Sequence, residues 1–178
     1  MPLLSLFFRT IVGLLTLFFV TCVVVYSLPQ PLVGINIILL VSVIYFVYQK
    51  DTRIFWFSGL FHFFLELYSI NFFGLLLTSS SIALLVFFWL YKQVLTNTSW
   101  YAISILLFLV VGVYKFFYGL LFYLQKIFFS YKQSFLFYEY VWLGIQEMFC
   151  TAVVGGLVYI ILEYVLLPKK KQKKIFRL

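Results

Sequence analysis

The sequence predicts an all-α fold, a polytopic membrane helix bundle of about six transmembrane helices. Of its 178 residues, 65% are hydrophobic and only 10% are charged, and the mean hydropathy is +1.12. A soluble domain would carry about 25% charged residues. Because a water-soluble core cannot absorb this much apolar surface, the bilayer must act as the solvent. We expect one transmembrane domain over residues 1–168 and a cytoplasmic polybasic tail over residues 169–178.

Six apolar runs follow one another and are separated by turn residues or charges, as expected for bilayer-crossing helices. In chain order they cover approximately residues 10–28, 32–48, 54–72, 74–91, 100–124 and 140–167. Pro29 and Pro31 end the first run in a short turn. The charged cluster Lys50–Arg53 separates the second run from the third. Asn71 and Gly74 then supply a tight turn before the fourth run.

Polar and basic residues also mark the connections around the fifth and sixth runs. Lys92 opens a short polar loop before the fifth run, which contains Lys115. The following connection carries Lys126 and Lys132 among many aromatic residues, a composition favoured at a membrane interface. Pro168 is expected to end the sixth run ahead of the basic tail.

The third run carries a polar face inside apolar sequence. Ser58, His62, Glu66 and Ser69 lie three or four residues apart, so they share one face if this run is helical throughout. A charged group in a membrane span costs about 2.5–3.5 kcal/mol on insertion scales, so Glu66 should face protein or water. By depth, Lys115 is the best candidate cation for Glu66. Both a structural contact and a directly functional site remain open. For His62, a helix-packing role is favoured over a ligand role.

The sixth run contains a stripe at four-residue spacing, formed by Glu147, Thr151 and Gly155. Small residues at this spacing allow transmembrane helices to approach closely. The stripe is therefore a candidate helix-packing face or a candidate face for a partner's helix.

Basic residues favour an orientation with both termini in the cytoplasm. With six crossings, ten basic residues then lie inside and only Lys126 and Lys132 lie outside. Six of the ten belong to the tail, and five of these are candidate contacts for anionic lipid headgroups or simply fix the orientation. These five are Lys169, Lys170, Lys171, Lys173 and Lys174.

Several function classes are disfavoured by the sequence. It shows no nucleophile–base arrangement, carboxylate dyad or cofactor motif, and its polar loops are too short to build a catalytic cleft. Cys22 and Cys150 stand in apolar runs without metal-ligand spacing. We therefore expect no enzyme, cofactor, metal site or nucleic-acid partner.

The third run and its flanks resemble a signature of the bacterial rod shape-determining protein MreD family. The matching residues are Arg53, Gly59, Glu66, Leu67, Ser69 and Gly74. Asn36 and Tyr45 in the second run also resemble the family's second helix. The chain departs from the family pattern at Glu66, where Asp is usual, and at His62, where glycine is usual. The proline that normally precedes the position of Asn36 is five residues earlier here, at Pro31.

The resemblance implies a fold similar to the substrate-binding subunit of energy-coupling-factor vitamin transporters. It also implies a non-enzymatic role in the cell-elongation machinery for peptidoglycan, in the bacterial cell (inner) membrane. The resemblance implies a bitopic MreC-like protein as a partner, with RodA, a class B penicillin-binding protein and MreB as further members of the same machinery. The alternative function is a solute-binding subunit of a vitamin-type transporter. Such subunits usually present alanines on the first helix, and residues 10–28 contain none.

The predicted topology is directly testable by cysteine labelling. Because Lys126 is placed outside and Lys173 inside, Lys126→Cys and Lys173→Cys should react with a membrane-impermeant thiol reagent from opposite faces. The experiment requires Cys22 and Cys150 to be replaced by serine first. Labelling of both introduced cysteines from the same side would contradict the six-crossing topology.

Overall fold

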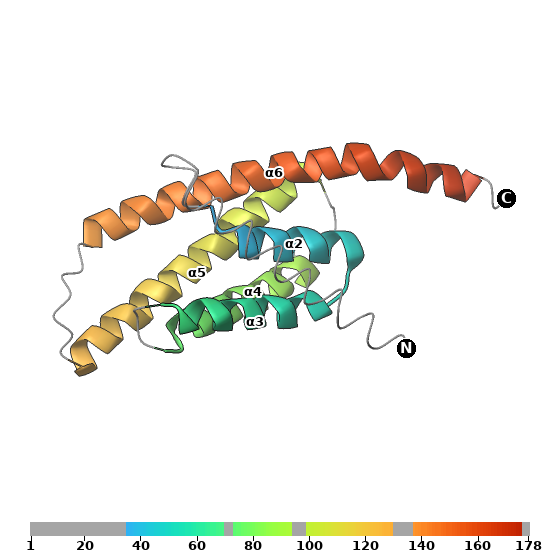
Figure 1. Cartoon of the computed structure of the whole chain (residues 1–178). Coiled ribbons are helices and arrows are strands. Elements are labelled where there is room, and N and C mark those ends of the chain that lie inside the picture. The colour runs from blue at the N-terminus through green and yellow to red at the C-terminus, as the bar shows by residue number, and fades with distance from the viewer. Residues whose placement is uncertain (1–34, 70–72, 94–98, 130–136, 176–178) are drawn as a thin grey trace, which may run out of the picture.

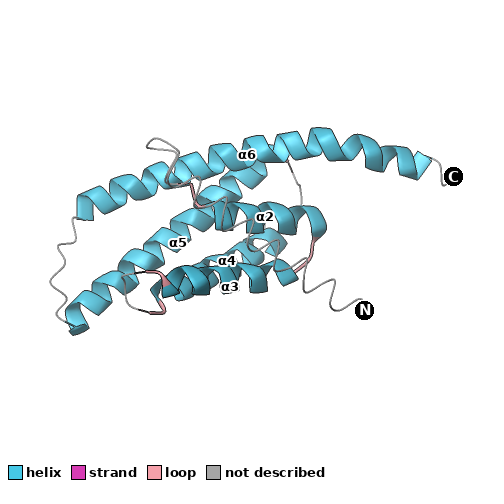
Figure 2. Cartoon of the chain, in the orientation of Figure 1, coloured by secondary structure: helices cyan, strands magenta, loops and turns pink. Residues whose placement is uncertain are grey.

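The computed structural model describes residues 35–69, 73–93, 99–129 and 137–175, and this part of the chain forms five helices and no strand (Figures 1 and 2). The predicted first helix, residues 10–28, lies outside the described residues. The helices are α2 (Ile37–Gln49), α3 (Arg53–Leu67), α4 (Leu75–Gln93), α5 (Trp100–Phe129) and α6 (Phe137–Ile175). The described part of the chain is therefore all-helical, as the sequence predicts.

Three of these helices are long and apolar enough to cross a membrane. The qualifying segments are Leu75–Gln93, Trp100–Phe128 and Phe137–Tyr164. The other two helices are shorter, since α2 has 13 residues and α3 has 15. At 1.5 Å per residue, α2 is about 20 Å long, which is less than the roughly 30 Å of a bilayer's hydrocarbon core. These features are those of a helical membrane protein with three spans evident by length and composition.

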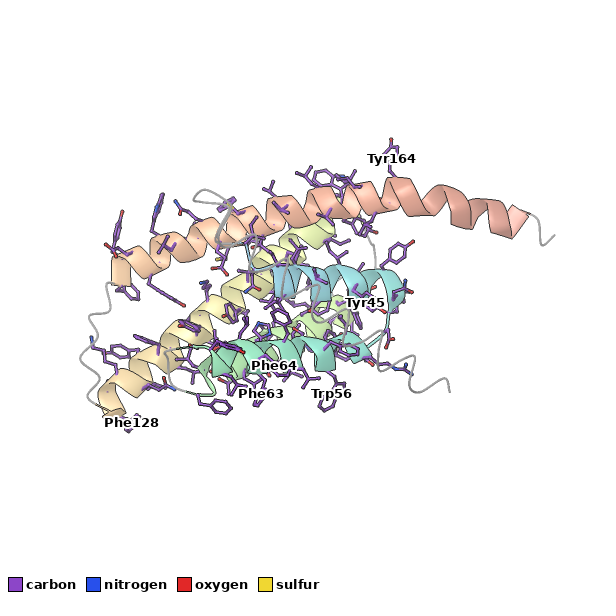
Figure 3. All side chains as sticks on the ribbon, in the orientation of Figure 1. Tyr45, Trp56, Phe63, Phe64, Phe128 and Tyr164 are labelled. Atoms are coloured by element: carbon purple, nitrogen blue, oxygen red, sulfur yellow. The ribbon has the colours of Figure 1, made fainter. Side chains whose placement is uncertain are left out.

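Helix α2 lies at the centre of the bundle. Helices α3 to α6 each pack on their neighbours in the chain, and α2 contacts all four of them. In Figure 1, α2 lies between α6 on one side and the pair α3 and α4 on the other. Apolar side chains on every side of α2 are buried, including Leu39, Val43 and Val47, while Tyr45 points outward (Figure 3). A helix that is apolar all round is a core helix, and α2 has that role here.

An aromatic cluster joins α2 to the ends of α3 and α4 nearest the Lys50–Arg53 turn. The Phe46 ring of α2 stacks on Phe55 of α3 at 5.0 Å and meets Phe87 and Tyr91 of α4 edge-on at 5.4 and 5.2 Å. Edge-on and offset aromatic pairs add about 0.5–1.5 kcal/mol beyond their buried area. The cluster therefore fixes the three helices against one another at this end.

Helices α5 and α6 form a long antiparallel pair whose glycines admit side chains from the opposite helix. A Cβ at Gly112 would overlap Met148, one at Gly119 would overlap Tyr140, and one at Gly155 would overlap Leu107. In these pairs, the residue number in α6 rises as the residue number in α5 falls, so the two helices run antiparallel. Close approach through small residues is the usual basis of helix packing in membranes, where lipid supplies no hydrophobic drive.

Two helix ends differ from the sequence prediction. Helix α3 ends at Leu67 rather than near residue 72, and the Tyr68 N–H bonds to the Leu65 carbonyl in a tightened last turn. Helix α6 continues past Pro168 to Ile175. Proline removes one hydrogen bond, but the following lysines and glutamine are strong helix formers. Gly74 has a φ of +99°, which explains why the turn before α4 requires glycine.

Gly155 provides a test of the α5–α6 packing. In Gly155→Leu the new side chain would collide with Leu107 and approach Leu40, so we expect a loss of unfolding free energy of about 1–3 kcal/mol or failure to accumulate. Thermal unfolding in detergent measures this change. Gly59→Leu is the matched control, because a Cβ at Gly59 meets nothing within 4 Å. Equal melting temperatures for the two variants would contradict the packing.

Candidate functional site

Glu66 caps the start of the helix that follows its own. Its side chain is 3% exposed, and its two carboxylate oxygens accept hydrogen bonds from the backbone N–H groups of Leu76 and Leu77 at 2.9 and 3.0 Å. These are two of the first N–H groups of α4, which have no partner within their own helix. A carboxylate at a helix N-terminus is also favoured by the helix dipole. Glu66 thus joins α3 to α4 through its side chain.

His62 lies one turn before Glu66 and is almost fully buried. Its Nδ1 donates to the Ser58 carbonyl oxygen at 2.8 Å, because a carbonyl can only accept. The imidazole ring lies 6.2 Å from the Tyr114 ring of α5, between centroids. The Ser58 hydroxyl is buried and has no hydrogen-bond partner among the described atoms. His62 therefore fills the α3–α5 interface and forms a hydrogen bond within its own helix.

The structure divides the predicted polar cluster of Ser58, His62, Glu66, Ser69 and Lys115. Ser58, His62 and Glu66 share the buried face of α3. Ser69 follows the end of α3, so it does not continue that face as a helix would place it, and its N–H donates to the Glu66 carbonyl at 3.0 Å. Among the described residues, the ion pair of Lys115 is with Glu147 and not with Glu66.

Lys115 and Glu147 form an ion pair between α5 and α6. The distance from Lys115 Nζ to Glu147 Oε2 is 2.5 Å, and the two side chains are 24% and 12% exposed. The Tyr140 hydroxyl donates to the Lys115 carbonyl, also at 2.5 Å. Both charged residues lie near the middle of the apolar segments Trp100–Phe128 and Phe137–Tyr164. An ion pair at this depth needs further hydrogen bonds to offset the loss of hydration.

Asn36 supplies one of those further hydrogen bonds and begins α2. Its Nδ2 donates to Glu147 Oε1 at 3.5 Å, and its Oδ1 caps α2 by accepting from the Leu39 N–H at 3.2 Å. The Asn36 backbone N–H donates to Thr151 Oγ1 at 3.1 Å. Lys115, Glu147, Asn36 and Thr151 therefore form one connected cluster at the start of α2, which we term the α2-start cluster.

The stripe of Glu147, Thr151 and Gly155 packs inside the bundle. Glu147 and Thr151 bond to Asn36, Thr151 is fully buried, and Gly155 is buried against Leu107 and Leu40. Of the two roles considered for this stripe, the structure gives it the helix-packing role. Because these residues already contact α2 and α5, docking of a partner's helix on the same stripe is disfavoured and stays a prediction.

The carboxylates of Glu66 and Glu147 each connect neighbouring helices. Both Glu66 oxygens accept backbone N–H groups, and both Glu147 oxygens are engaged by Lys115 and Asn36. Within the described ranges, no group of three or more His, Cys, Asp or Glu side chains is placed to hold a metal ion. The geometry supports a static role for both carboxylates.

The predicted lipid-contacting lysines lie on the last turns of α6. The helix backbone is described to Ile175, and the side chains from residue 165 onward lie outside the described part. Headgroup contact by Lys169, Lys170, Lys171, Lys173 and Lys174 therefore stays a prediction.

Sequence reasoning missed the role of Asn36 and the partner of Lys115. An asparagine immediately before an apolar run is a recognisable helix start, so the cap itself carries a local signal. Its bonds to Glu147 and Thr151 join residues 111 and 115 positions apart. Depth counting cannot distinguish Glu66 from Glu147 as the partner of Lys115, because distance along the membrane normal does not specify which helices are neighbours.

No protein-family model, curated protein or solved structure matches this chain.

Glu66 substitutions test the cap. Glu66→Leu leaves two partly buried N–H groups without an acceptor, whereas Glu66→Gln retains one acceptor oxygen. Each stranded group costs about 1–3 kcal/mol, so the unfolding free energy should fall from wild type to Gln and further to Leu. Denaturation in mixed micelles measures the order. The exposed Glu139, in the first turn of α6, gives the control Glu139→Gln, with a loss of about 0.3–1 kcal/mol. A Leu variant as stable as the Gln variant would rule out the cap.

Proposed function

We propose that this protein is a non-enzymatic membrane component of the cell-elongation machinery, similar to MreD, that acts by docking other membrane proteins. It would reside in the bacterial inner membrane with six crossings and both termini in the cytoplasm. Its fold would be similar to that of the substrate-binding subunit of energy-coupling-factor transporters. The expected partner is a bitopic MreC-like protein, with RodA, a class B penicillin-binding protein and MreB as further members of the assembly.

The geometry around Glu66 is the observation that carries the proposal. The most specific part of the resemblance is an acidic residue followed by Leu67, Ser69 and Gly74. Gly74 has the positive φ that the turn requires, and the acid caps the helix beginning directly after it. The spacing between Glu66 and Gly74 is thus explained by one structure, a turn at Gly74 that brings the start of α4 to the Glu66 carboxylate. This supports the proposal that the resembling family has the same local structure. A glutamate in place of the family's usual aspartate meets the same requirement, since both are carboxylates.

The same geometry supports a non-enzymatic role. Catalytic carboxylates exchange protons with a substrate or water, and they need an accessible oxygen. Both Glu66 oxygens are occupied by backbone N–H groups, and the side chain is buried. With short loops and most of its length in apolar helices, the protein has few means of acting other than contact with membrane segments or a small ligand.

The proposed six crossings include α2 and α3, which are shorter than the three helices that are long enough to span a membrane. Together they form a hairpin around the Lys50–Arg53 turn, and α3 is followed by Gly74 and the long helix α4. Short helices occur in membranes where protein covers their ends, and Asn36 provides that cover at the start of α2. Glu66, at the end of α3, instead caps the start of the long helix α4. The basic turn then lies on the cytoplasmic side, in agreement with the distribution of lysine and arginine.

Depletion and co-purification test the proposed function together. In the native bacterium, depletion should convert rods to rounded cells, and the tagged protein should retain the organism's own MreC-like protein through detergent extraction. Glu66→Leu should lose both properties if it lowers stability, while Glu139→Gln should retain both. Rod-shaped depleted cells, together with a small molecule that co-purifies stoichiometrically, would contradict the proposal and favour the vitamin-type transporter subunit.

A further inference from the structure

A groove runs between α3 and α4 on the outer surface of the bundle. Its volume is about 660 Å³. It is lined mainly by apolar side chains, with a glycine and a serine between them: Trp56, Gly59 and Phe63 from α3, and Ser81, Leu85 and Phe88 from α4. Trp56 is 80% exposed, and its side chain points away from the other helices, as does that of Phe63 (Figure 3).

Gly59 distinguishes this groove from the other helix contacts. The helical glycines of α5 and α6 that face a neighbouring helix each meet a side chain, whereas Gly59 meets nothing within 4 Å. Glycine in a helix interior costs stability relative to alanine, by roughly 0.5–1 kcal/mol. The absence of a side chain at Gly59 deepens the groove between Trp56 and Phe63. The groove can therefore receive a narrow apolar object.

One end of the groove is basic. Thr52 lines it, Arg53 follows as the first residue of α3, and Lys92 lies at the last turn of α4 with its Nζ 4.2 Å from the centre of the Phe88 ring. Phe88 itself lines the groove, so Lys92 stands at this mouth. The N-terminal end of α3 also lies here and adds the positive end of its dipole. We term Thr52, Arg53 and Lys92 the basic mouth.

Asp51 is the acidic side chain beside the basic mouth. Its Oδ1 accepts from the Arg53 backbone N–H at 3.0 Å and lies 4.0 Å from Arg53 Nε. Both side chains are exposed, so this pair is weak. The guanidinium retains its two terminal nitrogens as donors, and the mouth keeps a net positive charge from Arg53 and Lys92 after Asp51 is counted.

We propose that the groove binds one anionic phospholipid, with an acyl chain between α3 and α4 and the phosphate at the basic mouth. An acyl chain matches the narrow apolar shape, and charge complementarity selects an anionic headgroup. Basic pockets between transmembrane helices at the cytoplasmic side are a recognised form of anionic-lipid site. Under the orientation proposed above, the lipid belongs to the cytoplasmic leaflet. The binding itself does not depend on the proposed role in elongation.

Trp56 provides the reporter. A variant with Trp89→Phe, Trp100→Phe and Trp142→Phe retains Trp56 as the single tryptophan of the chain. In reconstituted bilayers, its fluorescence is quenched by dibrominated phosphatidylglycerol or by dibrominated phosphatidylcholine at equal mole fraction. We expect a relative binding constant favouring phosphatidylglycerol, of about fivefold for each basic residue that contacts the phosphate. Equal quenching by the two lipids would overturn the proposal.

Three further variants separate the groove from general attraction to a basic protein. The double variant Arg53→Gln and Lys92→Gln should bring the ratio of phosphatidylglycerol to phosphatidylcholine binding to about one. Lys126→Gln, in the last turn of α5, should leave this ratio unchanged. Neutralising Lys169, Lys170 and Lys171 in the tail should also leave it unchanged. Loss of the preference in the tail variant alone would assign the lipid to the tail and overturn the groove site.

Gly59→Leu tests the acyl chain. The new side chain would fill the groove and leave the basic mouth intact, so the quenching of Trp56 by both brominated lipids should fall severalfold while the protein stays folded. Unchanged quenching by both lipids would show that no acyl chain lies in the groove and would overturn the proposed site. The same quenching can be measured with the MreC-like protein added. If both lipids then cease to quench Trp56, the groove binds a partner's helix and the lipid proposal is overturned.

Discussion

A helix that begins within an apolar bundle presents backbone N–H groups where water is scarce, and the fold depends on how the chain satisfies these groups. Among the described helices, α4 and α2 show how this is done. The start of α4 is met by the Glu66 carboxylate, and the start of α2 is met by the Asn36 side chain and the Thr151 hydroxyl. Each unsatisfied buried group would cost about 1–3 kcal/mol, a large fraction of a typical stability. Glu66, Asn36 and Thr151 therefore lie at the two helix starts where this cost would otherwise arise.

The Lys115–Glu147 pair belongs to the same arrangement. Glu147 orients Asn36, and Lys115 balances the charge of Glu147, so the pair supports the start of α2 from two neighbouring helices. Removing one partner of a buried pair costs more than the pair itself contributes, because a lone charge remains in an apolar setting. Glu66, Lys115 and Glu147 are thus explained as supports of helix starts.

The sequence predicts the helical membrane class well, because composition and apolar run length depend on the bilayer alone. It also places Ser58, His62 and Glu66 on one face, since α3 is helical across all three. It fails for Ser69, because the tight last turn of α3 and the turn at Gly74 depend on Glu66 reaching α4. It fails for Lys115, because a local pattern such as the Gly155 stripe can mark a packing face but cannot say which helix packs against it.

The short central helix has a consequence for biosynthesis. At 13 residues, α2 is too short to be held in the bilayer by its own hydrophobicity, and its start is completed by Glu147 and Thr151. Those residues emerge from the ribosome more than a hundred positions after Asn36. Until then, the Asn36 N–H and side-chain amide lack the partners that they have in the folded protein. The packing of α2 is therefore completed only when α6 has been made.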